Sequence, residues 1–193
     1  MKITFINPPF RTQYGKFSRE SRSPSIGHSG EVYYPLWLIY AAAYAKTNGF
    51  AVEFIDSCAK RITRESTFQL IEKNCSDSRL FVLDTSTPSI TSDINFGVEL
   101  KRRYPQSFIL LVGTHPSVTV EETLNTNARI DGIARHEYDY TVSRLAQALE
   151  TGEALSIVDG LSYRSTDGIH HNKDAEYIQD LDSIPFAAEF IKD

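Results

Sequence analysis

The stretch Phe108-Ile-Leu-Leu-Val-Gly-Thr-His-Pro-Ser117 joins an apolar run of strand length to a short polar turn. The run ends at Gly113, and the residues after it lead into a segment with helical character. A strand that is apolar on both faces and ends in a small polar loop is typical of the ligand-binding edge of a parallel α/β sheet. We therefore expect other strands of this chain to end in the same way.

Four more strand-like runs share this pattern, and each stops at polar or turn-forming residues. They cover residues 2–6, 51–55, 79–83 and 130–134. Segments with helical periodicity or helical composition lie between and after them, at residues 36–45, 63–75, 92–103, 118–126 and 138–149. Such alternation predicts repeated βαβ units and a five-stranded, parallel, doubly wound sheet with helices on both faces. The default strand order for five units is 2-1-3-4-5, as in flavodoxin-like folds.

The pattern changes after Gly152. Residues 155–164 and 169–172 flank an Asp167-Gly168 turn, which predicts a C-terminal β-hairpin. Residues 177–186 have no partner of their own and are typical of a connector. We therefore predict an α/β domain over residues 1–152, followed by a hairpin and linker over residues 153–193.

Composition and charge exclude several classes of partner. The net charge is −5, from 20 basic and 25 acidic residues, and it argues against a general nucleic-acid or anionic-membrane surface. No apolar run approaches the ~20 residues of a membrane span, and the N-terminus does not resemble a signal peptide. Cys58 and Cys75 lack CxxC spacing, which indicates a reducing, cytoplasmic compartment and two buried thiols. The histidines show no metal-ligand spacing, so we expect no metal held by protein ligands.

The first βα loop excludes the common phosphate-binding sites. It reads Asn7-Pro8-Pro9-Phe10, where a dinucleotide site needs G-x-G-x-x-G and a flavodoxin-type or P-loop site needs backbone N–H donors. Proline lacks that donor. A phospho-acceptor site would need a second carboxylate beside Asp84, and the first loop has none. No G-x-S-x-G motif is present, and we find no convincing nucleophile or acid–base pair.

What remains is a sheet edge with short, neutral polar groups, which suits a large ligand that carries many amides. Arg135, His136 and Glu137 lie at one side of this edge, and Gly113 allows a close backbone approach. The neutral groups are Thr85, Ser86, Thr87, Thr114 and Ser117. Taken one loop at a time, these residues are better explained as turn and helix-cap residues, whereas the four loops together favour a ligand-binding edge.

The long polar segment of residues 11–34 allows two interpretations. Loops of this length in a compact domain are either functional or disordered. In the first case the segment makes the chain a docking or substrate-recognition module without cofactor, with Arg19, Arg22 and His28 contacting a partner or an anionic substrate. In the second it is a solvated, partly mobile loop.

Seven short motifs, taken in order, resemble the N-terminal cobalamin-binding domain of cobalamin-dependent radical S-adenosylmethionine enzymes. They are Ile6-Asn-Pro-Pro9, Ser18-Arg-Glu-Ser-Arg-Ser-Pro24, Tyr33-Tyr-Pro-Leu-Trp-Leu-Ile-Tyr-Ala41, Gly49-Phe-Ala-Val-Glu-Phe-Ile-Asp56, Val112-Gly-Thr-His-Pro116, Asp159-Gly-Leu-Ser-Tyr-Arg164 and Asp180-Leu-Asp-Ser-Ile-Pro-Phe186. In that family the last motif leads into a radical S-adenosylmethionine barrel with a three-cysteine iron–sulfur motif. The resemblance therefore implies a domain fragment of a methyltransferase or cyclase whose catalytic half, with its 4Fe-4S cluster and S-adenosylmethionine, is missing from this chain.

The resemblance also implies a site. The corrin of cobalamin would lie against four loops, and its nucleotide tail would enter between the sheet and its helices. The implied contacts are Asn7, Pro8, Pro9, Phe10, Thr85, Ser86, Thr87, Gly113, Thr114, His115, Pro116, Arg135, His136 and Glu137. Other cobalamin enzymes ligate cobalt with the histidine of a D-x-H-x-x-G loop, which this chain lacks. Two departures from the family pattern are Gly113-Thr114 in place of Gly-Gly and Arg135-His136-Glu137-Tyr138 in place of Gly-Glu-Gly-Glu.

Overall fold

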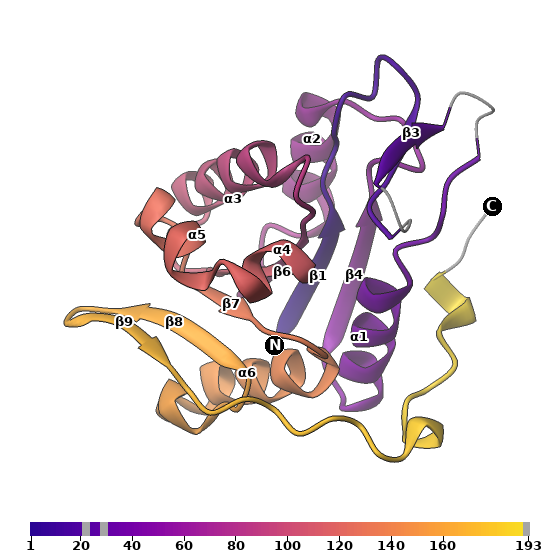
Figure 1. Cartoon of the computed structure of the whole chain (residues 1–193). Coiled ribbons are helices and arrows are strands. Elements are labelled where there is room, and N and C mark those ends of the chain that lie inside the picture. The colour runs from indigo at the N-terminus through magenta and orange to yellow at the C-terminus, as the bar shows by residue number, and fades with distance from the viewer. Residues whose placement is uncertain (21–23, 28–30, 191–193) are drawn as a thin grey trace.

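The computed structural model describes residues 1–20, 24–27 and 31–190 of the chain. Its main feature is a seven-stranded sheet in the order β4-β1-β5-β6-β7-β8-β9 (Figure 1). The strands are β1 (Lys2–Asn7), β4 (Ala51–Asp56), β5 (Leu80–Asp84), β6 (Phe108–Val112), β7 (Gly132–Ala134), β8 (Leu161–Ser165) and β9 (Gly168–His171). The longer helices are α1 (Leu36–Thr47), α2 (Arg64–Asn74), α3 (Ile90–Arg103), α5 (Val120–Thr126) and α6 (Asp139–Thr151).

The first five strands of the sheet are parallel, and their order confirms the predicted 2-1-3-4-5 arrangement. The predicted hairpin forms, but it also extends the sheet. Strand β8 pairs antiparallel with β7, with Ile133 opposite Ser162, and β9 pairs antiparallel with β8. The sheet is therefore mixed, and the expectation of a purely parallel sheet is wrong at this edge. Gly160 lies at the turn into β8, with a φ of 77°, and its carbonyl accepts from the backbone N–H of Arg135.

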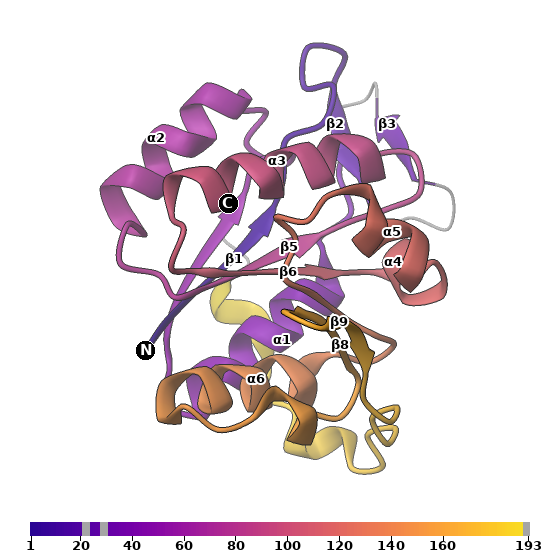
Figure 2. The same cartoon turned by 90° about the vertical axis from the view of Figure 1, so that its left-hand side faces the viewer.

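Helices cover both faces of the sheet, as expected for a doubly wound fold. Figure 2 shows α2 and α3 on one side and α1 and α6 on the other. Alternate residues of β1 supply the two cores: Ile3 and Phe5 pack with α1 and α6, whereas Ile6 packs with α2 and α3. Cys58 and Cys75 are both fully buried, as predicted.

Local signals explain where two of the helices begin and end. The hydroxyl of Thr63 caps α2 by accepting a hydrogen bond from the backbone N–H of Ser66. Gly152 ends α6 in the left-handed conformation, with φ of 77°. The turn expected after Gly113 is instead a helix, α4 (Thr114–Val118), which leads directly to α5. The polar residues of that turn therefore belong to the first turn of a helix.

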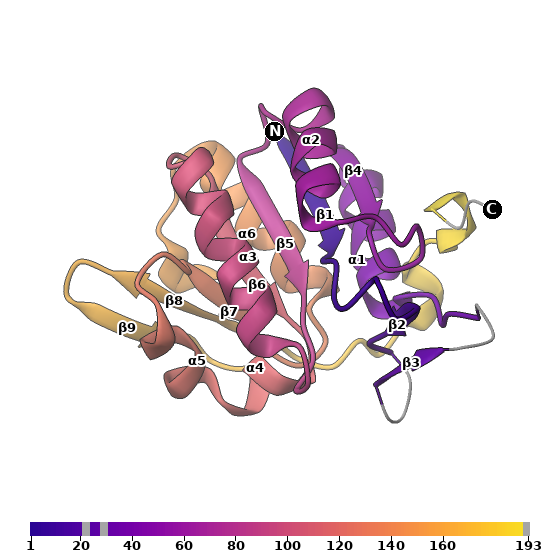
Figure 3. The same cartoon turned by 90° about the horizontal axis from the view of Figure 1, so that it is seen from above.

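The long segment before α1 is more ordered than the sequence indicates. It contains a two-stranded antiparallel pair, β2 (Lys16–Ser18) and β3 (Ser25–Gly27), with Phe17 opposite Ile26. In Figure 3 this pair lies beside the ends of β1 and β4. Arg19 is buried, so within the described residues this segment is not simply a solvated loop. Arg22 and His28, which the docking interpretation invoked, lie outside the described residues.

The predicted connector has partners in this chain, contrary to expectation. It crosses α6 and α1, where two short 3-10 turns, η2 (Leu181–Ser183) and η3 (Ala187–Phe190), contact the helices (Figure 1). The hydroxyl groups of Ser183 and Tyr140 lie 2.9 Å apart, and Phe190 packs on Phe54 with ring centroids 5.8 Å apart. None of the helices in the described ranges is long and apolar enough to cross a lipid bilayer.

Candidate functional site

A large cleft opens at the carboxyl edge of the parallel strands, with a volume of about 1320 Å³. Its floor comes from the loops after β5, β6 and β7, where the parallel topology brings the strand ends together. One wall comes from α1 through Trp37 and Tyr40, and another from the connector through Tyr177 to Phe186. Trp37 and Phe186 are mostly exposed, at 64% and 86%, so the mouth of the cleft is apolar. A large ligand with an apolar body would fit this shape.

Seven of the fourteen residues predicted to bind the ligand line this cleft. They are Thr85, Ser86, Thr87, Gly113, Thr114, His136 and Glu137. Two neighbours in the sequence do not: Pro116 is buried in α4, and Nδ1 of His115 lies 3.2 Å from the hydroxyl of Thr87. Ser117 also lines the cleft; its hydroxyl donates to the carbonyl of Gly113 and accepts from the backbone N–H of His136. It therefore ties the loops after β6 and β7 together.

The loops after β5 and β6 come close together at Gly113. Its φ is 120°, and a Cβ at this position would overlap the carbonyl oxygen of Thr85. The hydroxyl of Thr85 in turn donates to the carbonyl of Val112 at 2.7 Å. Only glycine fits this arrangement without strain, so the adjacent loops after β5 and β6 depend on Gly113 for their spacing.

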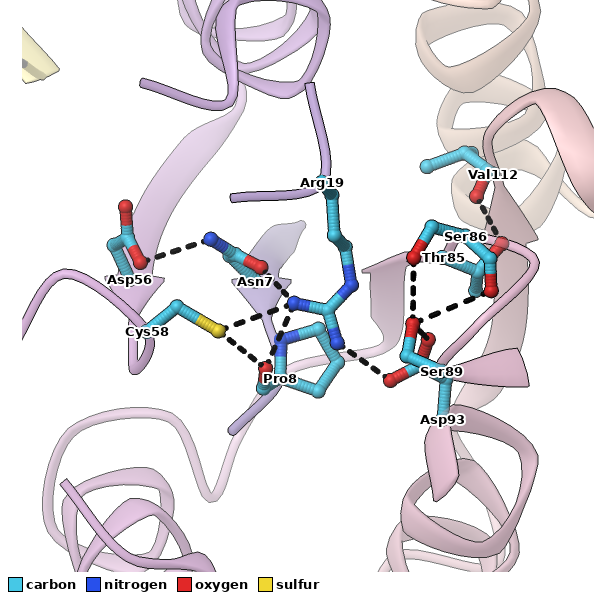
Figure 4. Close-up of polar contacts among 10 residues, drawn as sticks. All are labelled: Asn7, Pro8, Arg19, Asp56, Cys58, Thr85, Ser86, Ser89, Asp93 and Val112. Atoms are coloured by element: carbon cyan, nitrogen blue, oxygen red, sulfur yellow. Dashed lines mark hydrogen bonds and ion pairs between the residues drawn. The ribbon is translucent and has the colours of Figure 1, made fainter. Parts of the chain in front are cut away.

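The first βα loop lies beside the cleft. Asn7, Pro8, Pro9 and Phe10 do not line the cleft. Asn7 is buried, and its amide donates to Asp56 at 2.9 Å (Figure 4). The carbonyl of Pro8 accepts from Cys58 and Arg19. These residues build a buried polar network beside the cleft.

Arg19 is the centre of this network, and its side chain is only 1% exposed. Its guanidinium donates to Asn7, to Pro8 and, at 2.6 Å, to the equally buried carboxylate of Asp93. Asp93 also accepts from Ser89 (Figure 4). Burial opposes the charge of Arg19, but Asp93, Cys58 and Asp84 together more than offset this effect and raise the pKa of the guanidinium. The charge of Arg19 is paired inside the fold, so Arg19 does not present the free surface cation that the docking interpretation requires.

Arg135 is similarly engaged within the chain. It lies at the end of β7 and is 7% exposed. Its guanidinium donates to Ser162, to the carbonyl of Asn172 and to the carboxylate of Asp174. These bonds tie the hairpin and the start of the connector to the parallel sheet, and Arg135 does not line the cleft.

Three buried polar atoms of cleft-lining residues have no hydrogen-bond partner among the described residues. They are Oδ2 of Asp84, the hydroxyl of Tyr138 and Nε of Arg19. Buried polar atoms without partners are rare because each costs about 1–3 kcal/mol. Burial raises the pKa of Asp84, although the charge of Arg19 opposes this, and it also raises the pKa of Glu20 at the same cleft. The cleft floor therefore offers donors and acceptors that a ligand could satisfy.

The sequence gives no sign of the position of several lining residues. Arg19, which is buried, and Glu20 and Asp139, which are half-buried, all lie in polar stretches typical of exposed residues. Trp37 and Tyr40 carry a detectable signal, since two aromatic residues three positions apart are unusual in an otherwise alanine-rich helix. The position of Asp84 at the end of a strand is evident from the sequence, but there it suggests only a phospho-acceptor and not a ligand contact.

Asp139 gives the cleft a testable pH dependence. Burial raises its pKa to about 6, above the 3.8 of a free aspartate. The folded state therefore binds the proton more tightly than the unfolded state, and this contribution to stability is lost as the pH rises through 6. Between pH 5 and pH 7.5 we expect Asp139→Asn to gain thermal stability relative to the wild type.

The control is Asp77→Asn. Lys2 holds the pKa of this exposed carboxyl below its usual range, so Asp77 stays ionised throughout the interval from pH 5 to pH 7.5. Its difference in Tm from the wild type should be the same at both pH values. A constant difference for Asp139→Asn as well would contradict the raised pKa.

Comparisons with known proteins place this geometry in context. No model of a known protein family matches the chain. An uncharacterized methyltransferase of Pyrococcus horikoshii is 27% identical over 186 residues, which are 96% of this chain and 37% of the relative. The anaerobic magnesium-protoporphyrin IX monomethyl ester cyclase of Synechocystis is 27% identical over 182 residues, 94% of this chain and 34% of the cyclase. The chain thus spans about a third of the length of these relatives.

Solved structures share the fold. The cobalamin-dependent S-adenosylmethionine radical enzyme OxsB, with aqua-cobalamin and S-adenosylmethionine bound, matches 95% of this chain and 23% of its own, with a TM-score of 0.73 and 18% identity. The radical S-adenosylmethionine methyltransferase TsrM from Kitasatospora setae, with cobalamin and a [4Fe-4S] cluster bound, matches 95% of this chain and 30% of its own, with a TM-score of 0.65 and 12% identity. Over nearly its whole length the chain resembles one domain of cobalamin-dependent radical S-adenosylmethionine enzymes.

Proposed function

We propose that this chain is the cobalamin-binding domain of a radical S-adenosylmethionine enzyme and that it holds the corrin in the cleft at the carboxyl edge of the sheet. The observation that carries the proposal is the cleft itself, at the edge where parallel α/β sheets bind ligands. Its 1320 Å³ exceeds the roughly 300–1,000 Å³ that drug-sized ligands occupy. The likeness of the fold to proteins solved with cobalamin bound supports the same ligand.

The residues at the cleft fit the chemistry of a corrin. The exposed aromatic residues Trp37 and Phe186 offer apolar contact to a large ring. The hydroxyls of Thr87 and Thr114 and the unpaired polar atoms of Asp84 and Tyr138 offer hydrogen bonds to its amide side chains. Because Asp84 has a raised pKa, its carboxyl group would be able to donate a hydrogen bond as well as accept one.

The cobalt would receive no protein ligand from the first βα loop. That loop has Asn7-Pro8-Pro9-Phe10 in place of a histidine motif, and its polar groups are committed to Arg19, Asp56 and Cys58. When bound, cobalamin would supply a redox-active cobalt centre. The role of this chain would be to bind and orient it, while a 4Fe-4S cluster and S-adenosylmethionine would be held by a separate catalytic domain. The relatives' names make a methyltransferase or a cyclase the reaction classes for that whole enzyme.

A titration of the full 193-residue chain with hydroxocobalamin tests the proposal. We expect the corrin to co-elute with the protein in gel filtration and its visible spectrum to shift on binding. Thr114→Trp places a large ring in the cleft from an exposed position, and it should weaken binding at least tenfold.

The matched control is Thr126→Trp, at the exposed end of α5 and outside the cleft, which should leave the affinity unchanged. Absence of co-eluting corrin with a folded chain would refute binding by this domain. Equal affinity of the two variants would move the site away from the cleft.

A further inference from the structure

A second pocket, of about 430 Å³, lies on the other side of the first βα loop. Pro9 of that loop lines it together with Ser92 of α3 and the segments before α2. Three arginines also line the pocket, Arg11, Arg61 and Arg64. A chain with a net charge of −5 thus gathers three positive charges around one small cavity.

These three arginines form no ion pair with a carboxylate in the part of the chain that the structure describes. Arg64 donates to the carbonyl of Asn95 at 2.7 Å and lies over the ring of Phe96, with 5.5 Å from its Cζ to the centroid. The guanidinium of Arg61 donates to the carbonyl of Thr12 at 3.4 Å. By contrast, Arg102 and Arg103 on α3 both pair with Glu99. The positive charge at the pocket is therefore not balanced by these contacts.

Two further features concentrate positive potential here. The N-terminus of α2 opens onto the pocket through Thr63 and Arg64, and the dipole of an 11-residue helix favours an anion at that end. The neighbouring carboxylate of Glu65 lies close to its own backbone and to Thr63, both of which lower its pKa. The single negative charge of Glu65 offsets only part of the positive charge of the three guanidinium groups.

The backbone beneath two of the arginines is unusual. Arg11 and Arg61 have φ values of 47° and 50°, in the left-handed region that residues other than glycine rarely adopt. Asparagine or glycine would adopt this conformation at lower cost. The chain instead has arginine at both positions, beside the same cavity.

We propose that this pocket binds the phosphate group of a small molecule. Planar guanidinium groups match the geometry of phosphate oxygens, and the hydroxyls of Thr63 and Ser92 could add neutral hydrogen bonds. The site uses none of the residues that line the large cleft, so it does not depend on cobalamin binding.

The test uses the full chain and inorganic pyrophosphate as the probe, measured by calorimetry at low and at physiological ionic strength. The variant Arg11→Asn/Arg61→Asn removes two of the charges and keeps side chains that tolerate the left-handed backbone. We expect saturable 1:1 binding to the wild type and at least tenfold weaker binding to this variant. Its Tm should equal or exceed that of the wild type.

The matched control is Arg102→Gln/Arg103→Gln, which changes the net charge equally on α3 outside the pocket. It should bind pyrophosphate within twofold of the wild type. Equal weakening in both double variants, or no saturable binding to the wild type, would overturn the proposal. A loss of hydroxocobalamin affinity in Arg11→Asn/Arg61→Asn would overturn the independence of the two sites.

Discussion

Replacing Asp93 by alanine is expected to lower the free energy of unfolding by about 3–5 kcal/mol, because the charge of Arg19 is then left buried without its partner. Both side chains are almost fully buried, so water cannot replace the carboxylate. A loss of this size is a large fraction of the roughly 5–15 kcal/mol that stabilises a typical domain. Urea-induced unfolding of the full chain, followed by circular dichroism, measures it directly.

Two further variants test whether the loss in Asp93→Ala comes from the unpaired charge of Arg19. The variant Glu153→Ala removes the partner of Arg144 in a partly exposed ion pair and should cost at most about 1 kcal/mol. The double variant Arg19→Met/Asp93→Leu removes both buried charges and should cost less than Asp93→Ala alone. If the double variant is less stable than Asp93→Ala, the loss comes from packing and from the wider network rather than from an unpaired charge.

The second large effect is expected for Gly113→Ala, with a loss of about 2–3 kcal/mol in the free energy of unfolding. The φ of 120° is strained for alanine, and the new Cβ would overlap the carbonyl oxygen of Thr85. The strand ends of β5 and β6 would then have to separate. Cobalamin affinity should fall together with stability, since both loops line the cleft.

Gly152→Ala provides the matched control. Gly152 also has a positive φ, of 77°, but an added Cβ there meets no atom within 4 Å. The expected loss is about 1 kcal/mol, from the left-handed conformation alone. If both variants lose the same amount of stability, the overlap with Thr85 adds no destabilisation. The requirement for glycine at position 113 would then come from its φ alone.

The parallel strands could be predicted because each combines an apolar run with an abrupt polar stop. The same reasoning failed where the information is not local. Strands β2 and β3 are three residues each, too short for any periodicity to be read. The connector reaches α1 through single residues, chiefly Ala187 and Phe190, rather than through a repeating pattern. The antiparallel pairing of β8 with β7 joins two strands separated by α6, and no strand pattern in the sequence reveals the direction of that pairing.

The candidate site, like the fold, could be predicted from the sequence only in part. Loops after β5, β6 and β7 could be assigned to one edge because parallel strands end together. The buried position of Arg19 could not, because an arginine in a polar segment looks exposed and its partner Asp93 lies 74 residues away in the sequence. The resemblance places the first loop at the ligand, and the structure shows that Asn7 and Pro8 of this loop accept hydrogen bonds from Arg19.

The central position of β1 has a consequence for the order of folding. Residues 2–7 are synthesised well before their neighbours in the sheet, β4 and β5, which begin at residues 51 and 80. Until then the nascent chain carries Ile3, Phe5 and Ile6 without a partner strand, and closing such long-range parallel pairs is intrinsically slow. The sheet therefore cannot start to assemble around β1 before β4 has been synthesised, and the exposed strand is open to chaperones during that interval.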